Sequence, residues 1–161
     1  AWMERRGARI VYPETLPREE QLKLLQTTRH LIVAEGSVLH ALELIGRQPG
    51  KTVTVIARRP LWRGMERPLR SRFPQLLWID AVQALHWLPP ANPRVKGVAQ
   101  LDWGQLTAEL NARFGWEATP HDITGLEDAA NAQLAHLHQS LPLQSQQCTA
   151  DDYRPLRAGG W

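Results

Sequence analysis

The residues best suited to chemistry are Glu35, Gly36 and Ser37, which directly follow the apolar run Leu31–Ala34. The apolar residues that come next recur at the spacing of a helix, and His40 lies about one turn after Ser37 in that predicted helix. A glycine between a buried strand and a helix lets a ligand approach the main chain, and the helix start offers backbone N–H groups and positive dipole to a phosphate. Since no G-x-G-x-x-G or Walker loop is present, a plain strand-to-helix turn is the alternative.

A second group of candidates is the arginine-rich segment of residues 58–72, which contains six arginines and only one glutamate. The whole chain carries a net charge of only +3, so this positive charge is local. Such a patch suits a phosphate, an acidic polymer or peripheral association with a membrane surface, and does not suit a protein that coats duplex DNA. A solvated helix face is the alternative.

Four strands and the helices between them are predicted to position these residues. Apolar and β-branched runs predict strands at residues 10–12, 31–34, 52–56 and 76–79. Helices are predicted at about 17–28 and 37–45, with a broken helix in the arginine-rich segment because of its prolines and glycine. This β-α-β order predicts an α/β fold, a three-layer Rossmann-like domain with a mostly parallel sheet covered on both faces. Arg58 and Arg59 then end a strand at the carboxyl edge of the sheet, where such folds bind ligands.

The second half of the chain gives a weaker pattern. Residues 81–88 fit either a strand or a short helix. Asp102 with Gln105 predicts a helix that ends at Phe114, and Thr124 with Glu127 predicts one that ends near Ser140. One domain is expected over residues 1–141.

Residues 142–161 are poor in apolar side chains, so they are expected to form a loosely attached or disordered tail.

Composition narrows the classes of protein further. The chain has a single cysteine, Cys148, and no apolar run of the roughly 18 residues that a membrane-spanning helix needs, which favours a cytoplasmic location. Its first residues lack the apolar stretch of a signal peptide and read like the middle of a longer chain. No metal site is expected, because His136 and His138 would lie on different faces of a helix. Motifs typical of a serine hydrolase or of nucleic-acid binding are absent.

The sequence resembles a known family over residues 9 to 60. The matching segments are Ile10–Glu14, Leu16 with Glu20 and Gln21, Leu31–Val33, and Glu35–Ala41. Together they resemble the C-terminal half of family 61 glycosyltransferases, including bacterial capsular polysaccharide enzymes. Glu35 stands where that family often has histidine, and Ala41 stands where it has asparagine, whereas Gly36, Ser37 and Leu39 match its motif.

The resemblance implies a GT-B architecture, in which this chain is the domain that binds a nucleotide-sugar donor. Such enzymes commonly transfer the sugar with inversion and without a metal or other cofactor, using positive side chains and helix ends to stabilise the departing diphosphate. The donor-binding residues would be Glu35, Gly36, Ser37 and His40, with Arg58 or Arg59. The acceptor would be a glycan or a protein, and the general base would come from an N-terminal half of the same enzyme.

Individual roles stay open at this point. His40 could bond a diphosphate oxygen or a sugar hydroxyl, or it could be a structural residue. Glu35 could accept a sugar or ribose hydroxyl, or it could act as a cap or ion-pair partner. The rival hypothesis for the whole chain is a non-catalytic, degenerate domain that serves as a scaffold or interaction module, and the departures at Glu35 and Ala41 favour it.

Overall fold

A computed structural model describes residues 2–59, 64–92 and 96–148. The chain divides into two compact units. The first unit holds residues 3–57 and continues to Ile79, and the second holds Trp2, Arg58 and Arg59 and continues from Asp80. The domain predicted over residues 1–141 spans both units. Parallel strand pairing occurs in the first unit, and the described strands of the second pair antiparallel.

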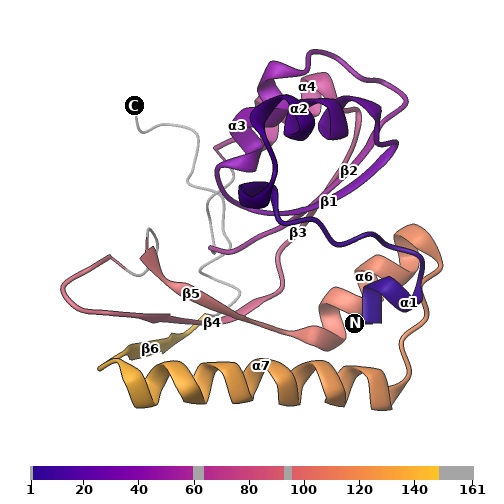
Figure 1. Cartoon of the computed structure of the whole chain (residues 1–161). Helices are drawn as coiled ribbons and strands as arrows, with labels where there is room; N and C mark the ends of the chain where they lie inside the picture. Colours follow the sequence, from indigo (N-terminus) through magenta and orange to yellow (C-terminus); the bar gives the residue numbers. More distant parts are fainter. Residues whose placement is uncertain (1, 60–63, 93–95, 149–161) are drawn as a thin grey trace. The chain divides into compact units, whose positions relative to one another are not determined.

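The first unit is built on a three-stranded parallel sheet in the order β1-β2-β3 (Figure 1). The strands are β1 (His30–Ala34), β2 (Thr52–Ile56) and β3 (Gln75–Ile79). They confirm the strands predicted at 31–34, 52–56 and 76–79. The central strand, β2, has fully buried Val53 and Val55, as expected for a strand with neighbours on both sides. Trp78 on β3 is also buried and belongs to the core of this unit.

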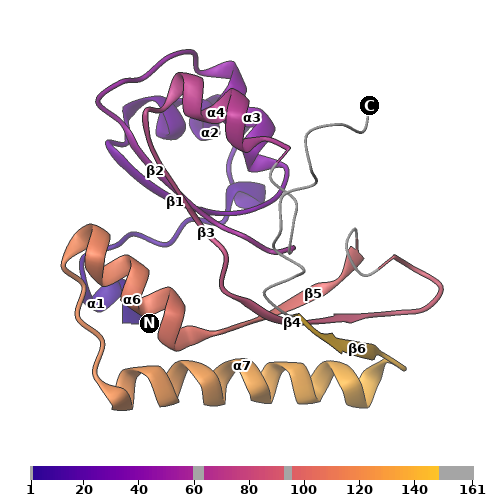
Figure 2. The ribbon, with the colours of Figure 1, turned by 180° about the vertical axis from the view of Figure 1, so that it is seen from behind.

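Three helices accompany this sheet: α2 (Arg18–Thr27), α3 (Val38–Leu44) and α4 (Glu66–Arg72). Figures 1 and 2 show all three grouped on one face of the sheet, so the predicted three-layer arrangement, with helices on both faces, is wrong for this unit. Helix α3 packs against α4. The fully buried side chains of this layer are Leu39, Leu42, Leu69 and Phe73. Pro68 is the third residue of α4, where its missing N–H costs no helical hydrogen bond, so the helix forms despite the proline.

A buried lysine closes the C-terminal end of α2. Lys51 is 4% exposed, and its Nζ donates to the carbonyl of Gln26, at 3.2 Å, and to that of Thr28. Carbonyls at a helix end have no partner within the helix, so the ammonium satisfies groups that would otherwise be left without one. Removal from water lowers the pKa of the Lys51 ammonium below its ordinary value.

The strand predicted at residues 10–12 is wrong. Ile10 and Tyr12 are exposed, at 39% and 63%, and the segment has no strand assignment. A β-branched and aromatic run forms a strand only where a neighbouring strand pairs with it. The segment leads instead from α1 (Trp2–Arg5) to a short 3₁₀ turn, η1 (Pro13–Thr15).

In the part of the second unit that the structure describes, an antiparallel sheet in the order β5-β4-β6 is accompanied by the helices α6 and α7 (Figure 2). The strands are β4 (Val82–Trp87), β5 (Val98–Leu101) and β6 (Gln144–Gln147). The open question over residues 81–88 is therefore settled as a strand. The helices are α6 (Trp103–Phe114) and α7 (Pro120–Ser140), which pack against each other. Trp2 packs edge-on against Trp116, with ring centroids 6.1 Å apart.

Of the helix starts predicted for α6 and α7, only the first agrees with the structure. At α6 the predicted cap is confirmed, because the carboxylate of Asp102 accepts the Gln105 N–H at 2.8 Å. The start predicted for α7 from Thr124 and Glu127 is wrong, since α7 begins at Pro120. Its capping box is formed by Thr119 and Asp122, whose side chains each bond the other residue's backbone N–H. Proline at the first helical position supports the earlier start.

The segment after residue 142 contributes a strand that the sequence pattern did not predict. Residues Gln144–Gln147 pair antiparallel with β4, with Gln147 opposite Ala84 and Gln144 opposite Trp87. All four side chains are exposed, so the backbone bonds alone define this strand. The rest of the predicted tail, residues 149–161, lies outside the described residues.

Candidate functional site

The carboxyl ends of β1, β2 and β3 lie at one edge of the parallel sheet. Ala34 stands opposite Ile56, and Ile56 stands opposite Ile79. The pairing extends one residue further, because the Glu35 N–H donates to the Ile56 carbonyl at 2.9 Å and the Ala57 N–H donates to the Ile79 carbonyl at 2.8 Å. The prediction that these strand ends share an edge is confirmed, and this edge is where open α/β sheets bind ligands.

The turn from β1 into α3 leaves room beside its backbone. Gly36 is half-buried and has no positive φ, and a Cβ added there would have no other atom within 4 Å. Ser37 has helical backbone angles, and its side chain makes no capping hydrogen bond to α3. Ser37 is exposed at the start of the helix.

The two ionisable candidates at this turn differ in accessibility. Glu35 is 2% exposed, so its carboxylate is held inside the protein, which favours a positioning role over contact with a freely exchanging ligand. His40 is the opposite case: 68% of its side chain is exposed, and its Nδ1 lies 3.6 Å from a carboxylate oxygen of Glu43 on the same helix. An incoming ligand can reach His40 without any change in the core.

The arginine candidates follow β2 immediately after Ala57. Arg58 is exposed and Arg59 is half-buried, and both group with the second unit rather than with Gly36. Their sharing of one cleft with Gly36 stays a prediction.

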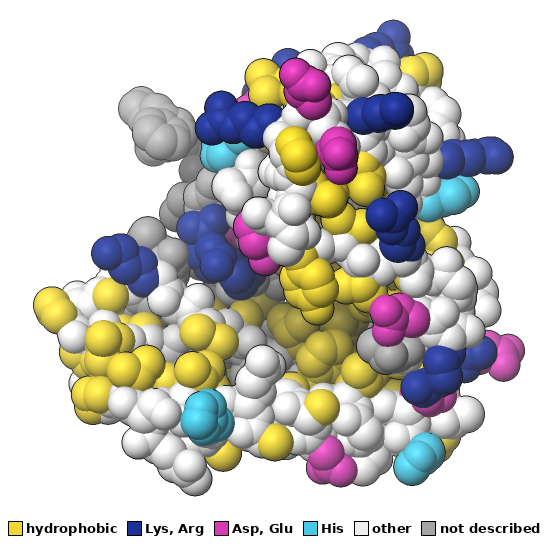
Figure 3. All heavy atoms as spheres, viewed as in Figure 1, with side chains coloured by type: hydrophobic (Ala, Val, Ile, Leu, Met, Phe, Trp, Pro, Cys, Tyr) yellow, Lys and Arg dark blue, Asp and Glu magenta, His cyan; other side chains and the backbone are white. Residues whose placement is uncertain are grey.

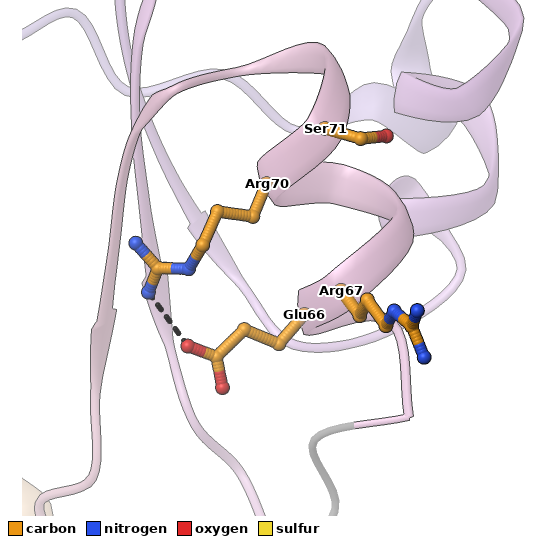
Figure 4. A pocket seen from close by; sticks show the side chains of 4 residues that line it. All are labelled: Glu66, Arg67, Arg70 and Ser71. Carbon is orange, nitrogen blue, oxygen red and sulfur yellow. Dashed lines mark hydrogen bonds and ion pairs between the residues drawn. The ribbon is translucent and has the colours of Figure 1, made fainter.

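Further along the arginine-rich segment, α4 carries a shallow hollow of about 500 Å³ lined by Glu66, Arg67, Arg70 and Ser71 (Figure 4). Arg70 bonds the Glu66 carboxylate at 2.7 Å and the Leu76 carbonyl at 3.2 Å, while Arg67 points to the other side of the helix. Arg70 therefore ties α4 to the start of β3, and its guanidinium is already engaged by these two contacts. This part of the segment fits the alternative of a solvated helix face.

The second unit contains a polar chain that sequence reasoning missed. His86 is 6% exposed, and its Nδ1 lies 3.1 Å from Nε2 of His138 on α7. Its Nε2 lies 3.3 Å from the side-chain oxygen of Gln100 on β5, whose amide in turn donates to Asn131 on α7 at 3.3 Å. Because an amide oxygen only accepts, His86 Nε2 donates to Gln100, and in the neutral ring Nδ1 then accepts from His138. Only a fold that brings α7 against the sheet joins these residues, which are far apart in sequence.

The hydrogen bonds that His86 makes predict its tautomer. Of the two neutral tautomers of His86, we expect the one with the proton on Nε2, because only that tautomer satisfies both contacts. Two-bond ¹H–¹⁵N correlation spectra at neutral pH measure the tautomer directly. The exposed His121 is the control, since it should show averaged tautomers. A proton on Nδ1 of His86 would contradict the hydrogen-bond chain.

The described residues contain no group of three or more His, Cys, Asp or Glu side chains arranged to hold a metal ion. None of their helices combines the length and apolarity required to cross a membrane. Comparisons of the chain with protein-family models, with curated proteins and with solved structures find no significant match.

Proposed function

We propose that the first unit binds the nucleotide-sugar donor of a glycosyltransferase that resembles family 61, with the diphosphate at the Gly36–Ser37 turn. One observation carries the proposal: three parallel strands end at a common edge, and one of them turns there through an uncrowded glycine into a helix. Backbone N–H groups at such a turn bind phosphate oxygens, and a glycine lets the phosphate come close. In this proposal the parallel sheet belongs to a Rossmann-like fold.

The proposed reaction is an inverting transfer that needs no metal. An acceptor hydroxyl, of a glycan or a protein, attacks the anomeric carbon, the bond to the diphosphate oxygen breaks, and a base removes the hydroxyl proton. The N–H groups of the Gly36–Ser37 turn and the imidazole of His40 stabilise the charge that develops on the departing diphosphate. Arg58 or Arg59 assists from the end of β2. The base belongs to the acceptor-binding half of the enzyme.

The second candidate is a non-catalytic scaffold that retains a degenerate donor-binding fold. The burial of Glu35 favours it, because this residue stands where the family often has histidine and its carboxylate is enclosed. Under this hypothesis the Gly36–Ser37 turn is a structural connection and binds no nucleotide.

Two substitutions at the turn distinguish the candidates. Gly36→Val places a branched side chain in the space proposed for the diphosphate, and the fold should tolerate it because that space is open and φ is not positive. We expect loss of measurable nucleotide-sugar binding. His40→Ala should weaken binding by about 1–3 kcal/mol through loss of a hydrogen bond to a charged group. Glu43→Ala is the matched control, since it removes the neighbour of His40 but no proposed ligand contact.

The measurement is calorimetric titration with a panel of nucleotide sugars, after circular dichroism has shown that each variant is folded. If the folded Gly36→Val and His40→Ala proteins bind as the wild type does, the site is wrong. If Glu43→Ala and His40→Ala lose the same affinity, His40 acts only through its neighbour. If the wild type binds no nucleotide sugar when supplied with an acceptor-binding half, the scaffold hypothesis replaces the transferase.

A further inference from the structure

A groove in the second unit runs between β5 and α7. Its walls are Val98–Leu101 of β5, Trp103 at the start of α6, and one face of α7 that includes Ala130, Leu134 and Leu137. Its volume is about 140 Å³. This is room for individual side chains rather than for a folded domain. Figure 3 shows hydrophobic side chains gathered over the strands of this unit, above α7.

One wall of the groove is the edge of a sheet. β5 pairs with β4 on one side, and no strand borders its other side within residues 2–59, 64–92 and 96–148. In an antiparallel pair, every second residue of an edge strand directs both its N–H and its C=O away from the partner. Such a row of backbone groups is a template for another extended segment.

The opposite wall is an apolar stripe on α7 that the unit covers only partly. Ala130, Leu134 and Leu137 recur at helical spacing on the face toward β5, yet each remains half-exposed and no residue of α7 is buried. Trp103 also lines the groove, while its indole Nε1 is buried and has no hydrogen-bond partner.

The charge around the groove indicates the chemistry of its occupant. α7 carries Asp122, Glu127 and Asp128 and has no lysine or arginine. Asp102 directly follows β5, so the end of the groove near Leu101 and Ala130 is acidic. Residues 80–92 and 96–148 contain seven acidic residues and only two basic ones. A segment with lysine or arginine at this end is electrostatically complementary.

We propose that this groove binds an extended peptide segment of a partner protein, which adds to the free edge of β5 as a further strand. Alternate side chains of the segment are apolar and pack on Ala130, Leu134 and Leu137 of α7. A lysine or arginine of the segment lies beside Asp102 and Glu127. Main-chain hydrogen bonds supply affinity, and the apolar stripe and acidic end supply selectivity. The groove belongs to the second unit, and the proposal does not depend on the nucleotide site proposed at Gly36.

The test is selection of short random peptides displayed on phage against the full chain, followed by calorimetry with the best synthetic peptide. We expect the selected peptides to share apolar residues at every second position and a lysine or arginine at one end. Methylating the peptide's backbone nitrogens one at a time should weaken binding roughly tenfold at alternate positions and little at the others, because only every second N–H of an added strand faces β5.

Two variants of α7 with the same substitution locate the peptide. Ala130→Gln fills the groove and should weaken binding roughly tenfold, whereas Ala135→Gln on an exposed position of the same helix should not change it. Glu127→Gln should weaken only peptides that carry the terminal lysine or arginine. Equal binding to Ala130→Gln and Ala135→Gln, a uniform response to N-methylation, or no selected peptide would overturn the proposal. Pairing of two chains through β5, seen as a dimer by sedimentation that Ala130→Gln abolishes, would also overturn it.

Discussion

Replacing Phe73 with alanine is expected to lower the free energy of unfolding of the first unit by about 3–5 kcal/mol. Phe73 follows α4 directly and is fully buried, together with Leu69 one turn earlier. Removing the ring forfeits its transfer from water and leaves a cavity that surrounding side chains fill only in part. No other change considered for this protein should cost as much.

Hydrogen exchange of the β2 amides measures this loss, because those amides belong to the same unit. Phe73→Leu should retain much of the stability, since it keeps an apolar side chain in the site. Tyr12→Ala is the control for loss of an aromatic ring, and it should change stability by less than about 0.5 kcal/mol because Tyr12 is 63% exposed. Equal losses for Phe73→Ala and Tyr12→Ala would show that the core assignment is wrong.

Replacing Lys51 with methionine is expected to cost about 1.5–3 kcal/mol. Methionine fills similar space, but it leaves the carbonyls of Gln26 and Thr28 without the ammonium that now binds them. Lys23 on the exposed side of α2 provides the matched control, since Lys23→Met removes the same charge without a buried contact. Urea unfolding of the two variants gives the comparison, and equal midpoints would contradict the role of Lys51.

Lys51 also predicts how stability depends on pH. Burial lowers the pKa of its ammonium below the ordinary value of 10.5, so the unfolded chain holds this proton more tightly than the folded one. As pH rises from the folded-state pKa to the ordinary value, this group's contribution should make the protein more stable. The stability of the wild type minus that of Lys51→Met, measured across alkaline pH, should therefore increase with pH over this range. A difference that does not vary with pH would argue against the lowered pKa.

The parallel sheet of the first unit could be predicted because its signals are local. Residues 31–34, 52–56 and 76–79 are short apolar runs bounded by turn residues, and any strand buried on both faces requires such a run. The segment at residues 10–12 has the same composition but no partner strand, and composition alone cannot reveal that difference. The start of α7 was predictable in principle, since Thr119 and Asp122 have the spacing of a capping box and enclose a proline at the first helical position.

Other features depend on contacts between distant residues, which no local pattern encodes. The strand at Gln144–Gln147 buries no side chain, so it has no hydrophobic alternation to detect. At the candidate site the sequence located the turn at Gly36, while the exposure of His40, the burial of Glu35 and the absence of a Ser37 cap required the fold. The pairing of His86 with His138 likewise depends on α7 lying against the sheet.

The order of strands in the second sheet has a consequence for folding during synthesis on the ribosome. β4 lies at the centre of that sheet, but one of its two neighbours, β6, is encoded after α7, near the end of the described chain. The parallel sheet, by contrast, has all its strands once Ile79 has emerged. Nascent chains that stop before Gln144 therefore expose one side of β4, and during that interval the chain is open to pairing with other nascent strands or to capture by chaperones.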